Sequence, residues 1–223
     1  MSYTYPLILF PTTYWLNNCS RKEAKKWFEY YLSVIPERLQ VLQEYLNATP
    51  GYEDWKLGYA TETVRALERW MIDHVELRNK TPEEIEQYST SIPERFKGHV
   101  PVDEKLLTDK TESLAVDMSM YFGEYMRHED PRLQWVLLEK GKRSVDYQNP
   151  VIIGTGLREQ NPRWLMRIFA YKISDHSNEP DFLINLKDTW MPELWRERYM
   201  TKEETNKWMD DEMEKWRAQT KGK

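Results

Sequence analysis

Four residues in the middle of the chain have types and spacing that could support chemistry. Asp117, Tyr121, Glu124 and His128 follow one another at intervals of four, three and four residues, so on a helix their side chains lie along one side. Two carboxylates and an imidazole can bind a divalent metal or exchange protons. A metal site normally needs further ligands, and the sequence has only four histidines and neither an HExxH nor a paired CxxC motif.

We therefore predict no metal and no cofactor, and we favour a structural role for these residues. In that interpretation Asp117 and Glu124 bond to neighbouring backbone or arginine groups, and His128 lies at the end of its helix. A catalytic site built from Asp117, Glu124 and His128 is the alternative.

A second candidate is the segment IIGTGLREQNP, residues 152–162, which places two glycines after a strand and before a helix. This is the context of a phosphate-binding loop. The GKS or GKT sequence and the third glycine are missing, so a turn explains the segment better. Arg163 and Arg167 follow one helical turn apart and could bind an anion, although arginines on a solvated helix face are common.

Nucleophilic catalysis has little support in the sequence. No serine lies in a GxSxG motif, and the single cysteine, Cys19, has no recognisable flanking signature. Cys19 precedes a predicted helix, whose dipole could lower the pKa of the thiol. A lone cysteine forms no intrachain disulfide, which favours the cytoplasm.

The C-terminal quarter is rich in tryptophan and methionine beside many charges. Both residue types are enriched in the cores of protein interfaces. We predict a partner surface there, with the alternative that these side chains close the core of the domain itself. The residues concerned are Trp190, Trp195, Trp208, Met209, Met213 and Trp216.

Composition excludes some classes of function. The net charge of −5 arises from 37 acidic and 32 basic residues mixed along the chain, which argues against nucleic acid as a partner. No apolar stretch approaches the roughly 18 residues that cross a bilayer, so we expect no membrane role. The N-terminal region lacks a basic n-region and a long apolar core, and we expect no export signal and a cytoplasmic protein.

Helix signals dominate the first half. A capping box at Ser20 and Glu23 predicts a helix start, and Pro36 predicts a kink or short break near residues 33–35. A second helix is expected over 61–78, and a third begins at Thr81, followed by proline and two glutamates. Residues 90–103 contain prolines and a glycine, so they form a connection and a candidate subdomain boundary between an N-terminal helical part and a C-terminal α+β part.

The second half mixes helices with short strands. A helix over Leu114 to Met126 contains Gly123, which costs about 1 kcal/mol relative to alanine and indicates that something packs closely there. Residues 134–138 and 143–147 flank EKGK and predict a hairpin, with 151–153 as a third strand. Further helices are expected from Asn161-Pro162, over 181–195, and over 201–219 after a capping box at Thr201.

Several of these segments together resemble a family of uncharacterised bacterial proteins, some of them of the immunity type. The similar segments are RKEAKKWFEYYLSVIPERLQVL, TPEEIEQY, TESLAVDMSMYFGEYM, LQW, NPVIIG and NP, within residues 14–195. The resemblance implies a link to toxin neutralisation by analogy. It assigns no active-site residue.

These observations predict one α+β domain over residues 1–223, mainly α, with a small antiparallel hairpin or three-stranded sheet packed against the helix over 114–126. The expected function is binding another protein, such as a toxin, rather than catalysis. One alternative is an enzyme with a carboxylate site near Asp117 and Glu124. Another is a homo-oligomeric structural protein that binds itself through the C-terminal tryptophans and methionines.

Overall fold

The computed structural model describes residues 4–8, 16–92, 94, 99, 104–196 and 201–220. The helices are η1 (Leu16–Asn18, a 3-10 turn), α1 (Arg21–Asn47), α2 (Thr61–Ile72), α3 (Pro82–Ser91), α4 (Asp109–Glu129), α5 (Pro162–Ser174), α6 (Phe182–Trp195) and α7 (Lys202–Thr220). The strands are β1 (Leu77–Asn79), β2 (Lys105–Leu107), β3 (Gln134–Leu137), β4 (Pro150–Ile153) and β5 (Glu159–Gln160). The predicted α+β class with mainly helical content is confirmed.

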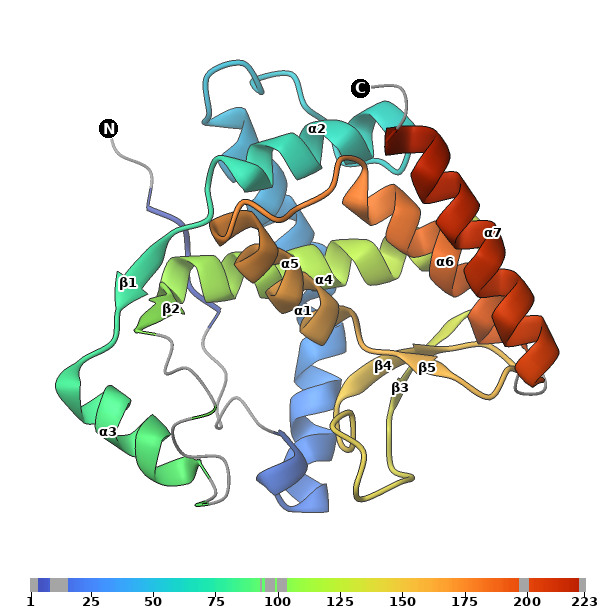
Figure 1. Cartoon of the computed structure of the whole chain (residues 1–223). Helices are drawn as coiled ribbons and strands as arrows, with labels where there is room; N and C mark the ends of the chain where they lie inside the picture. Colours follow the sequence, from blue (N-terminus) through green and yellow to red (C-terminus); the bar gives the residue numbers. More distant parts are fainter. Residues whose placement is uncertain are drawn as a thin grey trace.

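Helix α4 lies at the centre of the fold (Figure 1). Its side chains are buried almost continuously from Thr111 to Met126, as expected for a helix that is covered on all sides. Helices α1 and α5 pack against it, and α6 contacts its C-terminal half. This arrangement places residues 111–126 in the core.

Three strands form an antiparallel sheet in the order β3-β4-β5. Trp135 of β3 pairs with Ile152 of β4, which also pairs with Gln160 of β5. The prediction of a small three-stranded sheet is therefore confirmed, but the predicted hairpin partner is wrong. Residues 143–147 form turns rather than a strand, and β3 pairs with 150–153 instead.

A second, two-stranded sheet pairs β1 with β2 in antiparallel orientation. The predicted helix over 61–78 is too long, because α2 ends at Ile72 and residues 77–79 form β1. The sequence around Asp73 and His74 leaves the helix in a turn. Arg78 of β1 then makes two 2.7 Å bonds to the carboxylate of Glu84 in α3.

The predicted helix starts agree with the structure. Reciprocal capping boxes begin α1 at Ser20 and α3 at Thr81, and the same pair of bonds joins Thr201 and Glu204 at the start of α7. Helix α1 continues through Pro36, so the predicted short break does not occur, and the alternative of a kink stays a prediction. Its buried face compensates for the missing backbone donor of one proline.

Gly123 lies under the indole ring of Trp135, which confirms the predicted close packing. An added Cβ would lie 2.5 Å from Cη2 of that ring and 2.9 Å from Cε2. The indole Nε1 donates to Glu124 Oε1 at 2.8 Å. The glycine therefore allows the sheet, through β3, to approach α4 closely.

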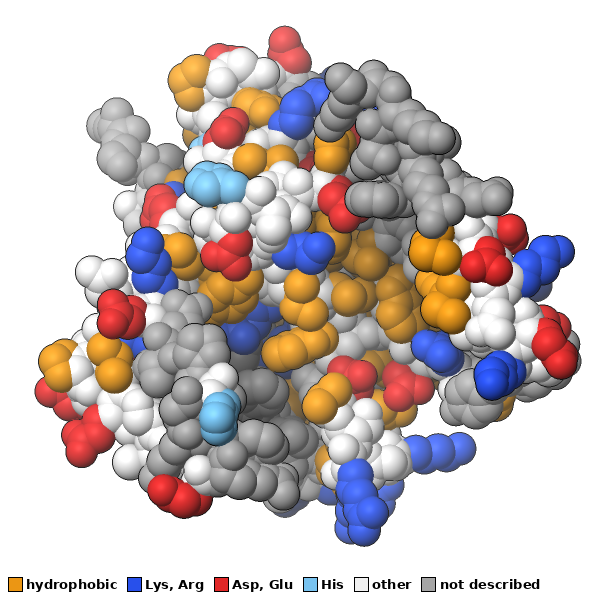
Figure 2. Space-filling view, viewed as in Figure 1, with side chains coloured by type: hydrophobic (Ala, Val, Ile, Leu, Met, Phe, Trp, Pro, Cys, Tyr) orange, Lys and Arg blue, Asp and Glu red, His pale blue; other side chains and the backbone are white. Residues whose placement is uncertain are grey.

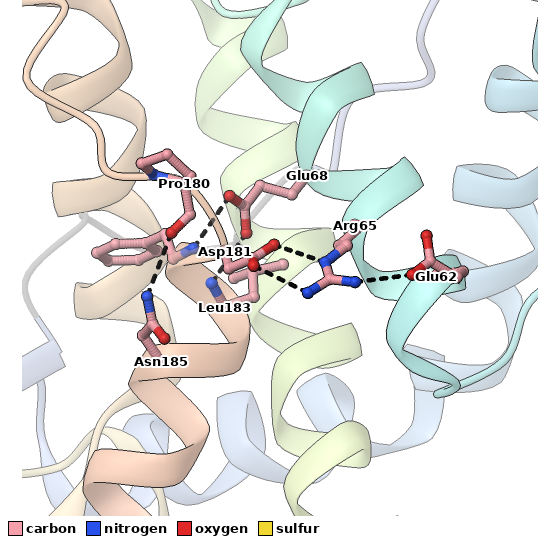
Figure 3. A network of polar contacts seen from close by, with 8 residues as sticks. Glu62, Arg65, Glu68, Pro180, Asp181, Leu183 and Asn185 are labelled. Atoms are coloured by element: carbon pink, nitrogen blue, oxygen red, sulfur yellow. Dashed lines mark hydrogen bonds and ion pairs between the residues drawn. The ribbon is translucent and has the colours of Figure 1, made fainter. Parts of the chain in front are cut away.

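Helix α6 is fixed to α2 by a polar network at its first turn (Figure 3). Glu68, which is buried, accepts from the backbone amides of Phe182 and Leu183 at 3.0 and 2.9 Å. Arg65 donates to both carboxylate oxygens of Asp181. A side chain of α2 thus satisfies the free N–H groups at the start of α6, in place of a local N-cap.

The predicted boundary at 90–103 falls largely on residues outside the described ranges and stays a prediction. One hydrophobic cluster includes residues on both sides of that connection, among them Leu42, Trp70, Phe122 and Phe169. Within the described part of the chain, no helix combines the length and apolar character needed to span a bilayer.

Candidate functional site

Asp117 lies fully inside the protein, in an ion pair with Arg38 of α1. Arg38 Nε donates to Oδ1 at 2.8 Å and Nη2 donates to Oδ2 at 2.6 Å, while the hydroxyl of Tyr5 also donates to Oδ2. Burial raises the pKa of Asp117, against the hydrogen bonds and charge of Arg38, which favour the carboxylate. Both oxygens of Asp117 therefore have partners inside the core.

This buried pair anchors the segment 4–8 to α1 and α4. Arg38 Nη2 also donates to the carbonyl of Pro6 at 2.9 Å, and Ile8 N donates to Ser113 Oγ at 3.2 Å. Removal of either charge would leave the other buried and uncompensated. The geometry of Asp117 is that of a structural group, as the favoured interpretation of the sequence holds.

Glu124 and His128 do not join Asp117 in one site. Asp117 and His128 are eleven residues apart on α4, which at 1.5 Å per residue separates them by about 16 Å along the helix axis. Glu124 forms an ion pair with Arg127 at 2.8 Å and accepts from the Trp135 indole. His128 is exposed in the last turn and packs on the ring of Tyr59, 4.9 Å between centroids. Across the residues that the structure describes, no cluster of ligands could hold a metal ion.

The GTG loop, residues 154–156, lies against the C-terminal end of α6. The amide of Gly156 donates to the carbonyl of Leu194 at 2.8 Å, and the amide of Leu157 donates to the carbonyl of Arg196 at 3.0 Å. A Cβ at Gly156 would lie 2.6 Å from the same carbonyl oxygen. Gly154 and Gly156 therefore allow the C-terminal end of α6 to pack closely against this loop. The role of the segment is structural, as expected for a turn.

Arg163 and Arg167 lie at a cavity of about 100 Å³ at the start of α5. The exposed fraction of Arg163 is 9%, its Nη1 donates to Asn149 Oδ1 at 3.3 Å, and its guanidinium stacks on Trp27 at 4.9 Å. Arg167 is paired with Glu112 of α4 at 3.1 Å. The favoured interpretation, two arginines on a solvated face, is therefore wrong for Arg163, which the fold buries.

The rest of the cavity wall comes from the turn that precedes β4. Asp146 and Asn149 line it together with Asn161 and Trp164, and Asn161 Nδ2 donates to Asp146 Oδ1 at 2.7 Å. Sequence reasoning missed Asp146 because it assigned 143–147 to a strand, and it gave Asn149 no role. The signal that could have found them is the composition DYQNP, which is typical of turns.

The tryptophans and methionines predicted to form one partner surface divide into two groups. Trp190 and Trp195 of α6 are partly buried against the hydrophobic core, which agrees with the alternative that they close the domain. Trp208, Met209 and Met213 of α7 are 50%, 46% and 47% exposed. Trp216 lies in α7, and its side chain is outside the described part of the structure.

The three half-exposed residues of α7 border a hollow of about 560 Å³, together with Asn206 and Asp210. In Figure 2, hydrophobic side chains form a band across the centre of the face, over α5 and α6, and continue to the inner side of α7. We call Trp208, Met209 and Met213 the α7 stripe. It is the largest group of exposed apolar side chains on one described helix.

Comparison with known proteins adds no relative: no family model, curated protein or solved structure matches this chain. The resemblance to an immunity-type family stays a prediction.

Proposed function

We propose that this protein is a binding module that recognises another protein through the α7 stripe. The observation that carries the proposal is the half-exposure of Trp208, Met209 and Met213 on one helix beside a hollow of about 560 Å³. Isolated exposed apolar residues are ordinary on protein surfaces, whereas clusters of large ones indicate an interaction site. Tryptophan and methionine are the residue types that supply affinity and adaptability at such sites.

The hollow is open to solvent, and its described lining comes from α7 alone. Such a surface suits a partner helix or loop that packs along α7. Met209 and Met213 are four residues apart and lie on neighbouring turns of one helix face, and Trp208 lies beside Met209, about 100° around the helix axis. A partner with two apolar anchors along an extended or helical segment matches that spacing.

Charges around the stripe favour a basic partner. Asp210 borders the hollow, and Glu203 and Glu204 occupy the first turn of α7. Opposite charges around an apolar contact raise the association rate more than the final affinity. We infer a partner whose apolar anchors are flanked by lysine or arginine, such as a basic toxin enzyme.

The carboxylates near Asp117 and Glu124 support the rival enzyme less well. An enzyme site requires groups that converge on a cleft, whereas Asp117 is enclosed with Arg38. Glu124 is one helical turn from His128, but its carboxylate is paired with Arg127 and accepts from the Trp135 indole. No second function is therefore proposed. Self-association through the α7 stripe is an outcome that the same experiment distinguishes.

The test is affinity capture from the native host with a matched pair of variants. Trp208→Ala with Met213→Ala removes most of the α7 stripe. Lys207→Ala with Asp211→Ala changes the side of α7 that is turned away from Met209 and Met213, and it leaves the net charge unchanged. We expect a stoichiometric partner with wild type and the control, and none with the stripe variant.

Native mass spectrometry of each eluate separates the alternatives. A heterocomplex that disappears only with the stripe variant supports the proposal. A homodimer that the stripe variant converts to monomer indicates the self-association alternative. Equal capture by the stripe variant and wild type would refute a role for α7.

A further inference from the structure

The cavity at the start of α5 has a wall that combines two guanidinium groups with one carboxylate. Arg163 and Arg167 contribute positive charges, and Asp146 contributes a negative charge. The charge of Arg167 is paired with Glu112 of α4, which lies outside the wall, so Arg163 is the main positive group of the cavity. One helical turn separates the two arginines, which places their Cβ atoms about 5–6 Å apart. The cavity is independent of the α7 stripe, since they have no lining residue in common.

The polar groups of this wall are held in place by neighbours. Arg163 is fixed between Asn149 and the Trp27 ring, and Glu112 fixes Arg167 from α4. Asp146 Oδ1 accepts from Asn161, whose own Oδ1 caps α5 by accepting from the Trp164 amide. A site with fixed polar groups loses little entropy on binding.

The combination of charges selects the chemistry of the ligand. Guanidinium groups match the geometry of a carboxylate, and the N-terminal end of α5 also favours negative charge. The carboxylate of Asp146 can accept more hydrogen bonds than the one from Asn161, and it repels a second negative charge. A simple polyanion such as phosphate fits poorly, whereas a ligand with one carboxylate and one ammonium matches both signs.

The volume and the surroundings of the cavity narrow the class of ligand further. A volume of about 100 Å³ exceeds that of one water several-fold, which suits the polar end of a small molecule. At the opening, Val145 is 65% exposed and Trp164 is 38% exposed. These two side chains offer an apolar rim for a hydrocarbon group attached to that polar end.

We propose that the cavity binds a free α-amino acid with an apolar side chain. Its carboxylate lies against Arg163, its ammonium lies against Asp146, and its side chain lies on the rim of Val145 and Trp164. This site goes beyond the proposed function, because it gives the binding module a small-molecule ligand.

The test is calorimetric titration of the full chain with L-leucine and with its two half-molecules. The halves are 4-methylpentanoate, which lacks the ammonium, and 3-methylbutylamine, which lacks the carboxylate; inorganic phosphate is the simple anion. We expect L-leucine to bind at least about tenfold more tightly than either half, the value of one charged hydrogen bond. No binding of L-leucine at millimolar concentration, equal affinity for a half-molecule, or tighter binding of phosphate would overturn the proposal.

A variant of Asp146 in the cavity wall separates a role in ligand binding from a purely structural role. Asp146→Asn should weaken L-leucine about tenfold while it strengthens 4-methylpentanoate, because the repulsion between two carboxylates is removed. Asp175→Asn makes the same chemical change at the other end of α5 and should alter neither affinity. If Asp146→Asn weakens both ligands equally, or neither, the assignment of the ammonium to Asp146 is wrong.

Discussion

Replacement of Gly123 by alanine tests the packing at the centre of the fold. An added Cβ would lie 2.5 Å from Cη2 of Trp135, where ordinary contact begins near 3.4 Å, so the indole must retreat by about 1 Å or more. The ring is held by its bond to Glu124 and by an edge contact with Tyr31 at 5.4 Å. Overpacking of this kind costs about 3 kcal/mol, at the upper end of its range.

Alanine also has the better helix propensity, by about 1 kcal/mol, so the net loss expected for Gly123→Ala is about 2 kcal/mol. Urea denaturation followed by far-ultraviolet circular dichroism measures it. In a Trp135→Leu background the ring is absent, and the same substitution should instead stabilise by up to about 1 kcal/mol. Stabilisation of the wild-type chain, or an equal loss in both backgrounds, would refute the close packing of Trp135 on Gly123.

Three further predictions concern stability. Glu68→Gln removes the negative charge of the carboxylate that accepts from the first amides of α6. It should lower the free energy of unfolding by about 1–2 kcal/mol in urea denaturation. An unchanged value would reject this capping role. Gln160 is 1% exposed, and its side-chain amide has no hydrogen-bond partner among the described residues. Gln160→Met should therefore raise the unfolding free energy by about 1–2 kcal/mol in the same assay. A lower unfolding free energy would show that the amide is satisfied. Hydrogen bonds from Arg78 and the Thr81 backbone lower the pKa of Glu84 to about 2. The stability that Glu84 contributes is therefore complete above its unfolded pKa near 4.5 and is lost as pH falls towards 2. Glu84→Gln should flatten the acid limb of a profile of unfolding free energy against pH, and an unaltered limb would contradict the pairing.

Local signals allowed the helices to be predicted. The capping boxes at Ser20, Thr81 and Thr201 join groups three residues apart, so the sequence alone contains both partners. Gly123 was informative for a similar reason, since a glycine within a helix is unfavourable unless something requires it. The identity of that partner, Trp135, depends on how β3 packs on α4.

Strand pairing was the part that sequence could not supply. Residues 143–147 have strand-like composition, but β3 pairs with 150–153, and the turn between them supplies Asp146 and Asn149 to the cavity. Strands β1 and β2 have three residues each and lie far apart in sequence, so neither carries a recognisable alternation. Such pairings are decided by tertiary contacts.

In the candidate sites, too, residue types and spacings could be read from the sequence, whereas contacts between distant segments could not. Asp117 on α4 and Arg38 on α1 are separated by 79 residues, so the sequence could not indicate that they neutralise each other. The one-turn spacing of Arg163 and Arg167 was visible, but the burial of Arg163 depends on Trp27 of α1. Half-exposure of the α7 stripe likewise follows from where α7 lies, while its composition was readable.

The most direct test of the proposed function is capture from the native host with wild type, the Trp208→Ala/Met213→Ala variant and the Lys207→Ala/Asp211→Ala control, read by native mass spectrometry. Our account predicts a one-to-one complex with a basic partner for wild type and the control, and free monomer for the stripe variant with unchanged circular dichroism. The same partner on all three proteins, or monomer for all three, would contradict recognition through α7.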